Sequence, residues 1–298
     1  MSRDDVPQLK IFQRMRKQKP VTASGTAEQL SWTLDSAGTL TLSGVGAVDS
    51  MLGVPWGAEK VTSLVIREGV TGVGLLAFYG HRNLKSVRIP AGVTQIGGCA
   101  FQDCVALERV ELPDGLTFIG GAAFQGCAAL EHVRIPASVT EIGGWAFRDC
   151  HALASVTIPG GVTEIGDFTF AFCKSLKEVR IPGGVTAIGN SAFAFCESLE
   201  SVTIPDGVTR IGDFAFQFCK NLSELRLPGS VAEIGDFAFQ FCERLSHVRL
   251  PDGVGRVGDW AFMSCENLRR ASVPARAEIG MGAFGRRTTV VRRDPRKE

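Results

Sequence analysis

The sequence has no run of roughly 18 or more apolar residues, which is the length that a membrane-spanning helix requires. Its first twenty residues carry six basic side chains and lack the apolar segment of a secretory signal peptide. The first absence predicts a protein without a transmembrane span. The second favours a cytoplasmic location, with the cell surface or the exterior as the alternative if the chain is part of a longer protein.

Residues with catalytic or metal-binding chemistry are few and poorly placed for it. The four histidines are scattered, and no glycine-rich loop is followed by the Lys and Ser or Thr of a phosphate-binding loop. The nine cysteines show none of the paired short spacings that zinc sites use. Cys150 precedes His151, but nucleophile and base are usually adjacent in space rather than in sequence. We therefore expect no catalytic residue, no metal and no cofactor, and predict that the protein is not an enzyme.

The formal net charge of +1 conceals an uneven distribution. Residues 1–20 and residues 286–298 each contain six basic and two acidic side chains, a net charge of +4 in each segment. Subtracting these two segments from the total leaves −7 for residues 21–285. The sequence therefore describes an acidic body between two basic ends.

One short sequence is copied many times, as the 35 Gly and 19 Phe against a single Tyr already suggest. The dipeptide Ala-Phe, once Thr-Phe, recurs at a constant step, and only the last step is one residue shorter. A Pro column follows the same period, and a Leu stands six residues before every Pro in it. The period falls within the range expected for leucine-rich repeats. The repeat Phe residues are Phe78, Phe101, Phe124, Phe147, Phe170, Phe193, Phe216, Phe239, Phe262 and Phe284.

The pattern of one unit predicts its local structure. The segment Leu-x-x-Val-x-Ile alternates apolar and polar residues, which is typical of a strand with one buried face, and Pro-Asp-Gly or Pro-Gly-Gly then turns the chain. The Asp that precedes x-Ala/Thr-Phe in four units, as in Asp213, is expected to cap a short helical turn. A single unit cannot bury its apolar face, so units must stack.

The predicted fold is a repeat solenoid, a leucine-rich-repeat right-handed superhelix. A parallel β-sheet is expected on its concave face, and short turns or helical segments are expected on its convex face. The predicted organisation is a basic disordered tail (1–24), an N-terminal β-hairpin cap (25–60), about ten 23-residue coils (61–285), and a C-terminal edge strand with a basic tail (286–298).

The repeat resembles a known family. The segment Ile204-Pro-Asp-Gly-Val-Thr-Arg-Ile-Gly-Asp-Phe-Ala-Phe-Gln-Phe-Cys219-Lys-Asn-Leu222 is similar to the BspA-like leucine-rich repeats, which are common in bacterial surface proteins. The similarity covers residues 61–290, and the hairpin sequence Leu-Ser-Trp-Thr-Leu-Asp resembles the leader of such domains. The resemblance implies adhesion or other protein contact and offers no family-wide catalytic residue.

The best candidate binding surface is the expected concave face of the sheet. The columns two and four residues before Pro contain seven Arg and three Glu, a net charge of +4. Arginine can fork onto carboxylates, so we predict an acidic protein partner, with cross-strand Arg–Glu pairs as the alternative role for these residues. The predicted partner-binding residues are Arg88, Arg109, His132, Arg134, Arg180, Arg226, His247, Arg249 and Arg270. Attachment of nucleic acid or an anionic membrane surface through the basic ends is the second hypothesis.

Two further sets of columns call for an interpretation. Eight cysteines, each three residues after a repeat Phe, are expected to form a ladder of buried, reduced thiols. Aromatic residues also stand two before and two after the repeat Phe, and they either fill the convex core or form a homo-oligomer interface. These aromatic residues are Trp145, Phe168, Phe172, Phe195, Phe214, Phe218, Phe237, Phe241 and Trp260.

Overall fold

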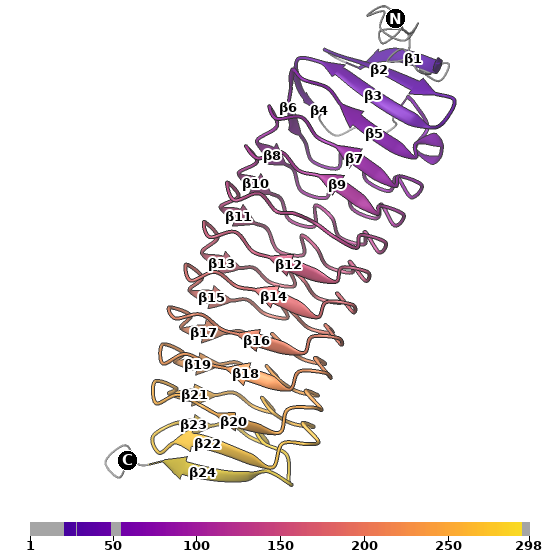
Figure 1. Ribbon diagram of the computed structural model, residues 1–298. Helices are drawn as coiled ribbons and strands as arrows, with labels where there is room; N and C mark the ends of the chain where they lie inside the picture. Colours follow the sequence, from indigo (N-terminus) through magenta and orange to yellow (C-terminus); the bar gives the residue numbers. More distant parts are fainter. Residues whose placement is uncertain (1–20, 28, 49–54, 294–298) are drawn as a thin grey trace, which may run out of the picture.

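The computed structural model describes residues 21–27, 29–48 and 55–293, and in this part of the chain it is a parallel-strand β-solenoid of about 11 turns. Figure 1 shows the coils stacked along one axis from the N-terminal to the C-terminal end. Because the period is constant, each strand residue pairs with its own copy in the next coil, as Val156 does with Val179. Within the described ranges, no helix is long and apolar enough to span a membrane.

Two rows of parallel strands run along the solenoid. The first row, which we call the strand face, corresponds to the predicted concave sheet. It contains β5 (Ser63–Ile66), β7 (Ser86–Arg88), β9 (Arg109–Glu111), β12 (Ser155–Thr157), β14 (Glu178–Arg180), β16 (Ser201–Thr203), β18 (Glu224–Arg226), β20 (His247–Arg249), β22 (Arg270–Pro274) and β24 (Thr289–Arg293). The second row contains β6 (Val70–Val73), β8 (Gln95–Ile96), β10 (Phe118–Ile119), β11 (Glu141–Ile142), β13 (Glu164–Ile165), β15 (Ala187–Ile188), β17 (Arg210–Ile211), β19 (Glu233–Ile234), β21 (Arg256–Val257) and β23 (Glu278–Ile279).

The N-terminal cap is the predicted hairpin. Strands β2 (Leu30–Asp35) and β3 (Thr39–Gly44) pair antiparallel, and β3 then pairs in parallel with β5, so the cap continues the strand face. Strand β1 (Val21–Ala27) adds to β2, which places the start of the cap at Val21 rather than at residue 25. Strand β4 (Gly46–Val48) pairs with β6, and a short 3-10 helix, η1 (Ala58–Lys60), precedes the first coil. The rest of the predicted basic tail, residues 1–20, lies outside the described residues.

Trp56 joins the cap to the first coil. Its ring is buried and meets the edge of Trp32 at a centroid distance of 5.7 Å. Its indole Nε1 donates a hydrogen bond of 3.2 Å to Nε2 of His81, which is itself buried at the start of the solenoid. Burial lowers the pKa of His81, so this imidazole favours the neutral form that can accept the bond.

The core is a stack of the repeat Phe rings. From Phe78 to Phe262 the rings are fully buried, and successive ring centroids lie 5.1 to 5.5 Å apart with interplanar angles of at most 10°. The eight ladder cysteines are buried beside them, as predicted. Each thiol donates to the carbonyl of the repeat Phe in the preceding coil, as Cys219 Sγ does to Phe193 O at 3.3 Å. The ladder therefore holds neighbouring coils together as well as filling space.

The third side of each coil, which we call the turn face, extends from two residues before to two residues after the repeat Phe. Two residues adopt positive φ here in every coil but the last, for example Phe214 (φ 59°) and Phe218 (φ 60°). Left-handed residues interrupt helical geometry, so the predicted short helical turns are replaced by non-helical turns. Backbone N–H groups point instead to the next coil, as Phe193 N donates to Ala215 O at 2.8 Å.

The aspartates that were expected to cap helical turns have another role, and that prediction is wrong. Asp213 Oδ1 accepts from the backbone N–H of Asp236 at 2.8 Å, and Asp236 Oδ1 accepts from Asp259 at 2.9 Å. Each side chain therefore binds the next coil rather than its own turn. This contact also accounts for the Gly before Asp236 and the Gly before Asp259, because a Cβ on Gly235 or Gly258 would collide with Oδ1 of the Asp in the preceding coil.

The left-handed positions yield a stability prediction. Ala122 has φ 56°, and this conformation costs an L residue about 1–2 kcal/mol relative to glycine. Glycine loses about 0.5–1 kcal/mol more entropy on folding, so Ala122→Gly should raise the free energy of unfolding by about 0.5–1 kcal/mol, measured by urea denaturation. The neighbouring Ala123 is fully buried and has no positive φ. Ala123→Gly should therefore lower stability, and equal losses in both variants would contradict this account of the turn face.

Candidate partner-binding face

The strand face presents the residues that the sequence singled out. In β14 the side chain of Val179 is buried, whereas Glu178 and Arg180 on either side are exposed. All nine predicted residues from Arg88 to Arg270 are exposed and occupy the same two columns of this face. The structure therefore brings them onto one surface, which follows from the side-chain alternation of a strand.

Several arginines form ion pairs on the face or at its rim. Arg180 Nε lies 3.0 Å from Glu178 Oε1, and Arg88 Nε lies 3.6 Å from Glu111 Oε2. Arg134 Nη1 contacts Asp114 Oδ1 at 2.8 Å. Each of these side chains is more than half exposed, so solvent screens the pairs and they contribute little to stability. Such weak pairs can be exchanged for contacts with a partner.

Other cations of the face are concentrated toward the C-terminal half. Within the part of the chain that the structure describes, Arg226 and Arg270 take part in no ion pair, and the same holds for Arg109 nearer the N-terminal end. Arg226 and Arg249 stand at the same column in successive coils. Of these two, Arg226 can bind a carboxylate of a bound segment through its guanidinium group.

A hollow of about 290 Å³ opens on the strand face between β18 and β20. It lies where the sheet is interrupted, because β18 pairs only with β16 whereas β20 pairs with β22. Leu225 at its floor is half-buried, although its counterpart Val248 in the next coil is buried. Arg226 and His247 line this hollow together with Ser223, Glu224 and Leu225. The structure thus joins two predicted residues in one depression with an apolar floor, which the repeat pattern did not indicate.

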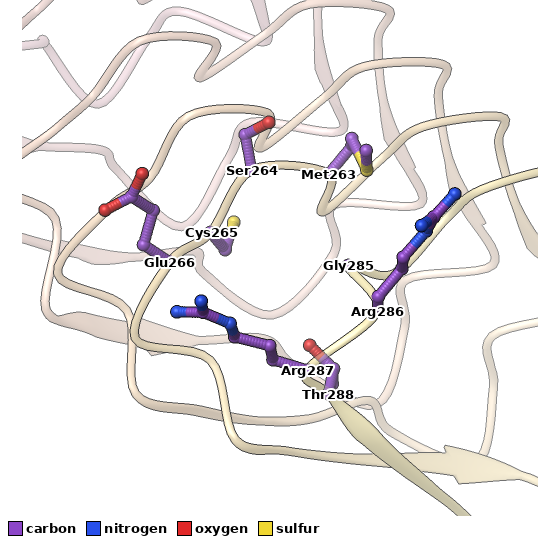
Figure 2. Close-up of a pocket in the computed structure, with 8 residues that line it drawn as sticks. All are labelled: Met263, Ser264, Cys265, Glu266, Gly285, Arg286, Arg287 and Thr288. Carbon is purple, nitrogen blue, oxygen red and sulfur yellow. The ribbon is translucent and has the colours of Figure 1, made fainter.

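A second hollow, of about 330 Å³, lies at the C-terminal end and was not predicted. It opens where the last repeat is one residue shorter than the others. Figure 2 shows that the guanidinium group of Arg287 lies on the side of Glu266, whereas Arg286 points the other way. Side chains of both charges therefore line this hollow, and the shortened repeat was the only sequence signal for it.

The Cys150–His151 dipeptide does not form a catalytic pair. Cys150 Sγ is fully buried and donates to Phe124 O, whereas His151 Nδ1 lies 2.9 Å from Phe172 O. Burial raises the pKa of the Cys150 thiol, which disfavours the nucleophilic thiolate. Over residues 21–27, 29–48 and 55–293, no group of three or more His, Cys, Asp or Glu side chains could hold a metal ion.

These features define a leucine-rich-repeat solenoid with a polar, cation-rich strand face. The sequence profile of the BspA type leucine rich repeat region matches six copies over residues 71–200 and 186–290, and the chain belongs to this family. Leucine-rich repeat proteins are generally non-enzymatic scaffolds for protein interaction or adhesion.

Several solved structures are similar to this chain. A leucine-rich repeat protein from Bacteroides ovatus is 29% identical, with a TM-score of 0.71 over 87% of this chain and 68% of its own. A leucine-rich repeat protein of T. pallidum is 29% identical over 75% of this chain and 91% of its own, with a TM-score of 0.48. A leucine rich cell surface protein from Faecalibacterium prausnitzii is 25% identical over 92% and 95% of the two chains, with a TM-score of 0.44. A search of the curated proteins gave no match.

Proposed function

We propose that this protein is a non-catalytic scaffold that binds an acidic protein segment on the strand face, centred on the hollow between β18 and β20. The observation that carries the proposal is that Arg226 and His247 line one hollow together with the half-buried side chain of Leu225. A floor that includes Leu225, beside the guanidinium group of Arg226, suits an acidic segment that also offers an apolar side chain, and Glu224 is the one acidic residue of the lining. Arg270, two coils beyond Arg226, extends the same cationic track toward β24.

The strand face is a better candidate than the basic ends, which are the second hypothesis. Arg293 is buried, donates to Leu250 O and lies 3.0 Å from Asp252 Oδ1. Arg292 Nη1 donates to two backbone carbonyls, those of Ala275 and Ala277. These two guanidinium groups cover the edge of the last coil, so they are engaged with the protein itself rather than offered to an anionic polymer.

The proposal is tested with a fluorescent peptide of alternating Glu and Leu residues. Arg226→Glu should weaken binding about ten-fold or more, because it replaces an attractive charge by a repulsive one in the hollow. The matched control is Arg82→Glu, which makes the same charge change at an exposed position off the strand face and several coils away from the hollow. We expect it to change the affinity less than two-fold in fluorescence anisotropy titrations.

Two outcomes would contradict the proposal. Equal losses in both variants would mean that only the overall charge matters, and unchanged binding by Arg226→Glu would exclude the hollow. Retention of double-stranded DNA or anionic vesicles at low salt, with no binding of the acidic peptide, would favour the basic ends instead.

A further inference from the structure

A column of stacked phenylalanine rings runs along the turn face, two residues after the repeat Phe of four successive coils. This Phe column consists of Phe172, Phe195, Phe218 and Phe241, and successive ring centroids lie 4.3 to 4.5 Å apart. Each ring covers the face of its neighbour, and Arg148 of the preceding coil lies over the ring of Phe172. All four side chains are half-buried. The surface that they leave to solvent is therefore formed largely by ring edges.

The backbone does not require phenylalanine at these positions. All four residues of the Phe column have positive φ, between 60° and 63°. Other coils place Gly126 (φ 73°) or Asp103 (φ 59°) at the equivalent position, and both residue types adopt this conformation more readily than Phe. The four coils thus accept a conformational cost in order to present aromatic rings. Such a cost is retained where another role offsets it.

A column of alternating charges borders the Phe column in the same four coils. This charged column stands four residues after the repeat Phe and consists of Lys174, Glu197, Lys220 and Glu243. Its two inner members pair within the chain, since Lys220 Nζ lies 3.1 Å from Glu197 Oε2. Its two outer members, Lys174 and Glu243, both reach solvent, and among the described residues neither takes part in an ion pair. The outer charges are therefore available to a partner.

The charged column is complementary to itself when it is read in reverse. Two copies that meet face to face with antiparallel solenoid axes are related by a two-fold axis in the plane of contact, which sets each column against its own copy in the opposite order. An axis between the coils of Phe195 and Phe218 sets Lys174 against Glu243 of the partner subunit. It also sets Glu197 against Lys220 of the partner subunit. Every facing pair then joins opposite charges.

The aromatic residues around this axis are arranged symmetrically as well. In the column two before the repeat Phe, Trp145 and Trp260 stand one coil beyond either end of the four coils. On the opposite border of the turn face, aspartates such as Asp213 and Asp236 would meet acidic copies of their own column. The complementary contact is therefore centred on the Phe column and the charged column rather than on the turn face as a whole.

Net charge favours the turn face over the strand face for a contact between identical copies. The two strand-face columns carry +4, so two strand faces repel each other. From two before to two after the repeat Phe, the five coils of Phe170 to Phe262 contain no charged residue. Two such surfaces can therefore approach without repulsion, and the charged column beside them sets their register.

We infer that the Phe column and the charged column form the interface of an antiparallel homodimer, in which the partner is a second copy of this chain. Four coils extend for about 20 Å at the usual strand spacing of about 4.8 Å. So small an interface belongs to the weaker class, and the dimer dissociates on dilution. The strand face lies on a different side of the coil, so each dimer keeps two strand faces free. The inference does not depend on the strand-face proposal.

Charge reversal at the outer pair tests this interface. Lys174 and Glu243 stand three coils, or about 14 Å, apart in one chain, so they are too distant to pair directly within it. Wild-type protein at up to about 100 µM should show a monomer–dimer equilibrium in sedimentation equilibrium. Lys174→Glu should raise the dimer dissociation constant about ten-fold or more, because it sets two glutamates against each other. Adding Glu243→Lys should return the constant to within about three-fold of wild type, because the facing charges are again opposite.

Two further variants complete the experiment. Arg82→Glu makes a matched charge change in the same column of the first coil, which has no counterpart across the two-fold axis, and it should leave the dissociation constant nearly unchanged. Phe195→Asp/Phe218→Asp places charges at the centre of the Phe column and should abolish the dimer. The fold accepts Asp at this position, since Asp103 and Asp149 occupy it in other coils. Far-UV circular dichroism and thermal melts establish that each variant is folded.

Four results would overturn the inference. The first is a wild-type protein that stays monomeric at the highest concentration, which would leave the Phe column to a different partner. The second is unchanged dimerisation by the folded Phe195→Asp/Phe218→Asp protein. The third is a failure of Glu243→Lys to rescue Lys174→Glu, which would exclude the antiparallel register. The fourth is an equal loss in Arg82→Glu, which would mean that only the overall charge matters.

Discussion

As the pH rises above the ordinary pKa of cysteine, the free energy of unfolding should fall by about 10 kcal/mol per pH unit. The protein should therefore unfold within a narrow alkaline range. Burial raises the pKa of Cys104 to about 12 and raises the pKa of six further ladder thiols, from Cys127 to Cys242. In the unfolded chain these thiols release their protons near the ordinary cysteine pKa of about 8.5. The folded chain keeps them. Each retained proton lowers the free energy of unfolding by about 1.4 kcal/mol per pH unit, and seven act together.

The direction of the stability change and its pH range follow from the same pKa shifts of the thiols. Below the pKa of the thiols in the unfolded chain, both the folded and the unfolded state hold their thiol protons. The thiols therefore contribute no pH dependence to stability in that range. Between that pKa and about 12 the unfolded state binds fewer protons, so stability falls as pH rises. Because domains are typically stable by only about 5–15 kcal/mol, the midpoint should lie about one to two pH units above the unfolded cysteine pKa.

Alkaline titration followed by far-UV circular dichroism and urea melts measures this slope. Replacing Cys150, Cys173 and Cys196 by Ala removes three of the seven protons and should reduce the slope to about 6 kcal/mol per pH unit. Cys99 lies outside the ladder and is only partly buried, so Cys99→Ala should leave the slope nearly unchanged. An unaltered slope in the triple variant would assign the alkaline transition to other groups.

Removing one ring of the Phe stack should be the most damaging single core substitution. Phe193 is fully buried between Phe170 and Phe216, with centroid distances of 5.5 and 5.2 Å. Phe193→Ala should therefore lower the free energy of unfolding by about 3–5 kcal/mol, because it loses the buried ring and leaves a cavity. Each coil contacts only its neighbours, so the damage can split the denaturant transition into two steps.

Phe284→Ala provides the matched comparison at the end of the stack. Phe284 is only partly buried and, within the described part of the chain, stacks on Phe262 alone, at 5.3 Å. Its loss should cost clearly less than that of Phe193 in guanidinium denaturation followed by circular dichroism. Equal losses at the two sites would mean that the terminal coil is packed as tightly as the middle, which would contradict its description as a thin cap.

The sequence by itself determined the repeat, the register and the buried columns. A constant period places each residue beside its own copy, so Val156 must pair with Val179 once the coils stack. It also places Phe in every coil, and Cys in eight of them, where they can only face the core. The identity of the nine exposed strand-face residues followed from the same alternation, because it depends on local periodicity alone.

Only the tertiary structure decided what the surface can do. The hollow at Leu225 depends on an interruption between β18 and β20, which was not predicted although Leu225 stands where most coils have Val. The positive φ values at Phe214 and Phe218 were not predicted, since aromatic residues rarely adopt them. The contact of Arg148 with Phe168 joins two different coils. Such contacts depend on the side-chain directions that the left-handed residues impose and on the stacking of one coil over the next, and neither is encoded in any single repeat.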